Sequence, residues 1–145
     1  MDYSSEIAFL HRVEVPNDPQ NKRTRLDEAA LLKLRQVHPN LPEAFLDYLR
    51  TIGAGCFREG QFLVQDHLFD LEDLGLAEHF DVRSGIQFFG DNFSGDFSGF
   101  DLNRADGLVV EFWHEDGSIF ETGKPFNEYI RTQLLMDEHG NDLRL

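Results

Sequence analysis

The spacing of apolar residues predicts a helix over residues 26–37. The apolar positions recur on one face at helical spacing, namely Leu26, Ala30, Leu31, Leu34 and Val37. Thr24-x-x-Asp27 in front of this segment is typical of a capping box. His38-Pro39 ends it, because the residue before a proline is pushed out of the α region.

Two further helices are predicted from proline and glycine signals. Pro42 suits the first position of the second helix, and Gly53 is a natural left-handed terminator for it. Pro125 opens the third helix. The apolar stripe of the second helix is Phe45, Tyr48, Leu49 and Ile52, and that of the third is Phe126, Tyr129, Ile130 and Leu134.

Short apolar runs between the helices predict five strands, over 61–64, 86–89, 97–102, 108–113 and 118–121. Asp106-Gly107 before the fourth run and Asp116-Gly117 before the fifth favour turns with positive φ. The last three strands therefore predict an antiparallel meander. Between the first two strands, Asp70 is expected to cap a short helical turn.

The two ends of the chain are less regular. Residues 7–15 fit a strand or a helix and 16–21 fit a loop, so 1–25 are treated as an N-terminal extension of undetermined conformation. The polar tail 137–145 is expected to fray. The order helix, helix, strands, helix predicts a single α+β domain over residues 1–145, with the helices segregated from an antiparallel sheet.

Composition indicates a folded and strongly acidic protein. The 145 residues are 41% hydrophobic and include 14 Phe, which is too much apolar surface for a disordered chain. The formal net charge of −14 disfavours nucleic acid and anionic membranes as partners, because both attract clusters of Lys and Arg. The charge favours fast encounter with a basic partner protein, although ordinary solubility explains it as well.

Cysteine usage and the N-terminus favour a cytoplasmic location. Cys56 is the only cysteine, so no disulfide forms within the chain and a reducing compartment is the simpler inference. We expect the Cys56 thiol to be buried and inert. Arg58 lies two residues further on, and a positive charge near the thiol would lower its pKa, so this alternative stays open. The N-terminus is acidic where a secretion signal is basic, and no run approaches the about 20 apolar residues that a membrane span needs.

Six short motifs follow one another between residues 26 and 135. They are the Leu41-Pro42 helix start, the Phe45/Leu49 stripe, the Gly53/Gly55 stop, the Phe89-Gly90-Asp91-x-x-x-Gly95-Asp96 turn, the Phe100-Asp101-Leu102 strand and the Gly107-Leu108-Val109-Val110 strand. This order resembles the SUKH superfamily, which includes the fungal Smi-Knr cell-wall-synthesis regulators and many bacterial immunity proteins. Two stretches depart from the family pattern, Ile52-Gly53-Ala54-Gly55 in place of Asn-Gly and Ile86-Gln87-Phe88-Phe89-Gly90 in place of Ile-Pro-Ile-Gly.

The resemblance implies both a fold and a role. The fold is a compact α+β domain with a twisted antiparallel sheet flanked by helices. The role is that of bacterial members that bind and neutralise toxins, often nucleases, deployed between competing cells. The departures from the pattern concern the subfamily more than the fold.

The Asp/Ser/Gly-rich loop after residue 90 has the composition of a chemical site but not the spacing of one. As a calcium loop beginning at Asn92, it has Phe97 where an EF-hand needs glycine. It has no basic residue for a phosphate, and Ser94 and Ser98 lack a histidine nearby in sequence, with His114 left as a partner in space. The expected structure is a turn whose side chains satisfy backbone N–H groups. No catalytic site, metal or cofactor is expected.

A surface for a basic partner protein is expected on this loop and the turn that follows. Carboxylates speed the encounter and aromatic residues usually supply the hot spots. The candidate contacts are Asp91, Asn92, Phe93, Asp96, Asp101, Trp113, Glu115 and Asp116, with Phe97 as a further possible anchor. Phe93 fits an exposed anchor or a plug under the loop, and the plug is the commoner behaviour. Charge reversal at Asp96 or Asp116 is expected to weaken binding without unfolding the domain.

Three functions are compatible with the sequence, in this order. The first is a non-enzymatic immunity protein that neutralises a toxin, expected to be a nuclease. The second is a regulatory or scaffold domain of the cell-wall-regulator type, with a stable housekeeping partner. The third is a small hydrolase or ligand-binding domain with a polar pocket near Asp91 and Asp96.

Overall fold

Seven antiparallel strands form one sheet, and their order across the sheet is their order along the chain, β1 to β7. The computed structural model describes residues 1–144, and the predicted α+β class is confirmed. The strands are β1 (Arg23–Thr24), β2 (Ala54–Phe57), β3 (Phe62–Phe69), β4 (Ile86–Asp91), β5 (Phe97–Asp101), β6 (Leu108–Trp113) and β7 (Ser118–Pro125). The helices are α1 (Ser4–Val13), α2 (Glu28–Val37), α3 (Glu43–Thr51) and α4 (Phe126–Leu134), with a 3₁₀ turn η1 (Pro19–Asn21).

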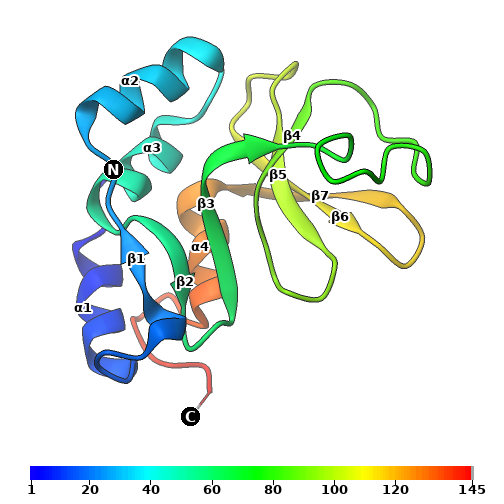
Figure 1. The fold of residues 1–145 in the computed structure, drawn as a ribbon. Helices are drawn as coiled ribbons and strands as arrows, with labels where there is room; N and C mark the ends of the chain where they lie inside the picture. Colours follow the sequence, from blue (N-terminus) through cyan, green and yellow to red (C-terminus); the bar gives the residue numbers. More distant parts are fainter. Residues whose placement is uncertain (145) are drawn as a thin grey trace.

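The main core lies where the helices meet one face of the sheet. In Figure 1 the four helices gather around the β1–β3 side, and α4 passes behind the strands. Phe45 of α3 and Phe126 of α4 pack edge to face, with ring centroids 5.3 Å apart. Phe89 and Phe100 from the sheet join them at 5.1 to 5.7 Å. The apolar stripes of α3 and α4 therefore meet each other and the sheet in one aromatic cluster on this face.

The long β3–β4 connection covers part of the opposite face. Phe80 of this connection packs against Phe112 of β6, with centroids 5.0 Å apart. Asp70 and Asp73 close the first turn of the connection, because each carboxylate accepts the backbone N–H of the other, at 2.9 and 3.0 Å. The second core therefore lies under a loop and not under a helix.

Several elements settle or correct the sequence prediction. Residues 4–13 form a helix, which settles the choice left open for the N-terminal segment. Asp27, expected as the last residue of a capping box, is itself the N-cap of α2 and accepts the N–H of Ala30 at 2.9 Å. Strand β2 was missed, because Gly53-Ala54-Gly55 indicates only the end of a helix. Strands β3 and β7 also run further than predicted, to Phe69 and Pro125.

The C-terminal tail, for which fraying is expected, makes specific contacts as far as it is described. Asp142 forms an ion pair with buried Arg58 at 2.9 Å. Arg12 of α1 donates to the Gly140 carbonyl at 2.6 Å, and Met136 forms an isolated bridge with Asp142. Leu145, the last residue of the tail, lies outside the described residues.

Candidate functional site

The β4–β5 loop holds its backbone with its own polar side chains. The Asp91 carboxylate accepts the Phe93 N–H at 2.8 Å, and the Asn92 side-chain oxygen accepts the Ser94 N–H at 2.9 Å. These bonds hold Phe93 at φ 65°, a left-handed conformation that bulky residues rarely adopt. The Phe93 side chain is 55% exposed, so it is not the expected plug.

Asp96 joins this loop to the β6–β7 turn. It accepts the backbone N–H of His114 at 3.0 Å and lies 2.8 Å from Nδ1 of the same residue. Partial burial raises the pKa of Asp96, but the hydrogen bonds from His114 and Asn92 outweigh that effect and hold the pKa below its ordinary value. The two turns are thus fixed together by a carboxylate that stays ionised at neutral pH.

Two exposed aromatic rings stack on the hairpin that β6 and β7 form. Trp113 and Phe120 have centroids 4.9 Å apart and planes 18° apart, and they are 40% and 45% exposed. Glu111 accepts the Trp113 indole N–H at 3.2 Å and the Tyr129 hydroxyl at 2.5 Å. Tyr129 in turn lies 2.6 Å from the buried Ser98 hydroxyl. A network rooted in the core therefore positions Trp113.

The two carboxylates of the β6–β7 turn differ in whether they already have hydrogen-bond partners. Asp116 accepts the Ser118 N–H at 3.0 Å, and hydrogen bonds from Ser118 lower the pKa of Asp116. Glu115 is exposed and has no hydrogen bond or ion pair with any residue of 1–144. Both oxygens of the Glu115 carboxylate can therefore accept hydrogen bonds or form an ion pair with a partner protein.

Asp101 and Phe97 do not belong with these residues. Asp101 lies at the other end of β5, about 13 Å from Phe97 at the strand rise of about 3.3 Å per residue. It is buried and pairs with Arg83 at 3.0 Å and Arg104 at 3.4 Å. Phe97 stacks on Phe112 inside the second core, with centroids 5.8 Å apart. Neither residue is placed to meet a partner.

We call the surface formed by residues 91–96, residues 113–116 and Phe120 the acidic aromatic end. Phe120 was missed by the sequence reasoning, although its place in the predicted strand that directly follows Asp116-Gly117 could have indicated it. A charge division was missed as well: residues 1–60 hold nine acidic and eight basic residues, whereas residues 61–145 hold eighteen and five. The acidic aromatic end therefore lies in the half of the chain that carries nearly all the net charge.

The residues weighed for catalysis or metal binding are not gathered into a site. His114 turns its ring to Asp96, and Ser98 is buried against Tyr129. Burial, with a smaller effect from Asp91, raises the pKa of the half-buried Cys56 thiol, which disfavours the thiolate. Within residues 1–144, no three His, Cys, Asp or Glu side chains are grouped as metal ligands are.

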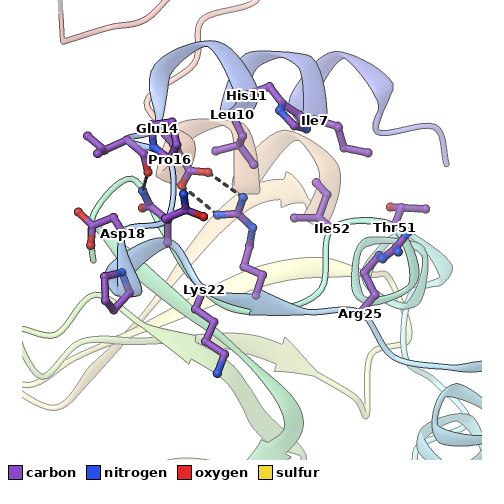
Figure 2. A pocket seen from close by; sticks show the side chains of 15 residues that line it. Ile7, Leu10, His11, Glu14, Pro16, Asp18, Lys22, Arg25, Thr51 and Ile52 are labelled. Carbon is purple, nitrogen blue, oxygen red and sulfur yellow. Dashed lines mark hydrogen bonds and ion pairs between the residues drawn. The ribbon is translucent and has the colours of Figure 1, made fainter.

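A cleft of about 1000 Å³ lies at the β1 edge of the sheet, opposite the β7 edge (Figure 2). Its apolar lining comes from α1 and from the end of α3, chiefly Ile7, Leu10 and Ile52. Arg23 reaches across it to Glu14, the residue that directly follows α1, in a two-pronged ion pair at 2.7 and 2.9 Å. The remaining ionisable lining residues are His11, Asp18, Lys22 and Arg25. Sequence reasoning gave no sign of this cleft, because its walls are far apart in the chain.

Comparisons with protein-family models, with curated proteins and with solved structures find no match to this chain. Within residues 1–144, no helix is both long enough and apolar enough to cross a bilayer.

Proposed function

We propose that this chain is a non-enzymatic protein that binds and neutralises a basic partner protein through its acidic aromatic end, in the manner of a cytoplasmic immunity protein. The observation that carries the proposal is that Phe93, Trp113 and Phe120 are all exposed beside carboxylates at the same end of the strands. The SUKH resemblance of the sequence motifs supports the immunity role. A toxin that acts on nucleic acid would supply the basic surface.

The backbone that carries Phe93 and the indole of Trp113 are held in place before any partner binds. Two hydrogen bonds within the loop fix the backbone around Phe93, and Glu111 fixes the indole of Trp113. Side chains ordered in advance lose less conformational entropy on binding. Such rings are the residue types that most often dominate binding energy.

The carboxylates supply steering rather than most of the affinity. Glu115 is unpaired within residues 1–144, and the surrounding half of the chain is strongly acidic. Charges at the rim of an interface mainly raise the association rate and its dependence on salt. The carboxylates therefore mainly raise the association rate, and the aromatic rings mainly slow dissociation of the complex.

The experiment is co-expression of this chain with any toxin domain that is found encoded beside its gene, followed by calorimetric titration at low and high salt. Trp113→Ala should weaken binding by about 30-fold or more, the loss expected for a hot spot. Glu115→Lys should slow association and reduce its salt dependence, whereas Glu138→Lys, an equal charge change on the C-terminal tail, should not.

Three results would contradict this proposal. They are equal effects of the two lysine variants, full binding by the Trp113→Ala variant, and failure of the chain to protect cells from the toxin. A stable housekeeping partner in place of a toxin would instead favour the regulatory function.

A further inference from the structure

Strand β1 presents unused backbone groups to the cleft at its edge. Cys56 N–H donates to the Lys22 carbonyl at 3.2 Å, and Arg23 lies opposite Gly55. This pattern makes Arg23 and Gly55 a non-hydrogen-bonded pair, so the backbone N–H and C=O of Arg23 point away from β2. Neither group has a hydrogen-bond partner among residues 1–144. Because β1 ends the sheet, these groups are free to pair with another strand.

A helix and an apolar lining complete the groove beside this edge. Figure 2 shows α1 above β1, with Leu10 and Ile52 between them. Ile7 extends the apolar lining along α1. A helix facing a free strand edge across apolar side chains is a geometry that suits an added peptide strand, because backbone bonds give affinity and the pockets receive alternate side chains.

The charge of the groove is opposite to that of the protein as a whole. Glu14 and Arg23 neutralise each other, and both are largely buried. Lys22 and Arg25 are exposed lining residues without an ion pair in residues 1–144. Asp18 is the remaining lining carboxylate, and it accepts the Gln20 N–H at 2.9 Å. In a chain of net charge −14, this groove has a local excess of cations.

We propose that the cleft binds an extended acidic peptide segment of a second partner protein, which adds as a strand to the edge of β1. Its backbone pairs with the N–H and C=O of Arg23. Alternate side chains place an apolar residue against Leu10 and Ile52 and a carboxylate near Lys22 and Arg25. This site lies on β1, whereas the acidic aromatic end lies on the β4–β5 loop and the β6–β7 hairpin, so it is independent of the function proposed above.

The test uses a fluorescein-labelled heptapeptide of alternating glutamate and valine, titrated with the full chain and followed by fluorescence anisotropy. Saturable binding is expected, with shifts of the Arg23 and Arg25 backbone amides in ¹⁵N NMR spectra. The double variant Lys22→Glu, Arg25→Glu should weaken binding about tenfold or more. Lys33→Glu, an exposed lysine of α2 away from the cleft, is the charge control and should leave binding within about twofold.

Two matched peptides separate the contributions. A peptide with lysine in place of glutamate should not bind, and one with N-methylated backbone amides should bind at least about tenfold more weakly. Equal binding of the N-methylated peptide would overturn strand addition, and absence of any saturable binding by the acidic peptide would overturn the site. If the chain instead self-associates and the double variant abolishes this, the occupant is a second copy and the proposal fails. None of these outcomes depends on Glu115 or Trp113.

Discussion

Replacing Asp142 by asparagine should reveal how firmly the C-terminal tail is bound. The Arg58 side chain is 3% exposed and its partner Asp142 is 10% exposed. Arg58 donates to both carboxylate oxygens, at 2.9 and 3.2 Å, and to the Leu134 carbonyl at 2.8 Å. Its guanidinium also lies 5.4 Å from the centroid of the Phe9 ring. Removing the negative charge leaves the buried guanidinium without a counter-ion, and its acceptors are then the Leu134 carbonyl and the amide oxygen of the new asparagine.

The magnitude follows from this burial. Removing one member of a buried ion pair costs about 3–5 kcal/mol. The amide in Asp142→Asn still accepts a hydrogen bond and the site is not completely closed, so we expect about 2–3 kcal/mol of lost unfolding free energy. At about 2–4 °C per kcal/mol for a chain near this size, the melting temperature should fall by about 5–10 °C.

The assay is urea unfolding followed by circular dichroism, with Arg58→Met and the double variant Arg58→Met, Asp142→Leu completing a cycle. The double variant should regain part of the loss, because it leaves no unpaired charge. A backbone hydrogen bond from Arg144 and the contacts with Arg58 lower the pKa of Asp142 in the folded state. Its stabilising contribution is therefore complete above the ordinary aspartate pKa of about 3.9 and is lost as the pH falls below it.

A change within about 0.5 kcal/mol for Asp142→Asn would refute the reasoning. Fast hydrogen exchange of the tail amides in the unmodified protein would also refute it. Both results together would show that the tail frays, as its polar sequence predicts.

Three further predictions concern the sheet and its turns. Tyr129→Phe leaves the buried Ser98 hydroxyl without its partner and should cost about 1–3 kcal/mol in urea unfolding, and no change would show that this network is dispensable. His114→Ala should raise the pKa of Asp96, measured from its carboxyl ¹³C shift, and an unmoved pKa would mean that His114 does not stabilise the carboxylate. Gly55→Ala places a methyl group 2.1 Å from the Lys22 carbonyl oxygen, at a position whose φ is 136°. It should therefore cost more than about 1 kcal/mol in thermal unfolding and expose the β1 amides to hydrogen exchange. A variant of unchanged stability with protected β1 amides would contradict this.

Much of the fold could be predicted from local patterns. The stripes of α3 and α4 repeat at helical spacing, and the β5–β7 meander is punctuated by Asp-Gly turns. Strand β2 could not be predicted, because its four residues have no alternation and follow directly on a helix terminator. Asp27 was assigned the wrong capping position because Thr24 is taken up by β1.

The candidate site was less accessible to prediction than the fold. Sequence proximity grouped Asp101 with Asp96, but a strand separates them and two arginines neutralise Asp101. The exposure of Phe93 depends on a left-handed backbone that two side chains impose, and no periodicity encodes it. The uneven division of charge, by contrast, is visible in the sequence itself, because counting acidic and basic residues in 1–60 and in 61–145 is enough to find it.

The sequential order of the strands has a consequence for folding kinetics. Each strand pairs with its neighbour along the chain, and the connections from β2 to β3 and from β4 to β7 are short, so these parts of the sheet can form hairpin by hairpin at a small loop-closure cost. The contacts between the two ends of the chain, such as Glu6 with Arg131 and Arg12 with Gly140, span more than 120 residues and close the largest loops. These contacts should form after the rate-limiting step, so weakening them should speed unfolding and leave the folding rate nearly unchanged.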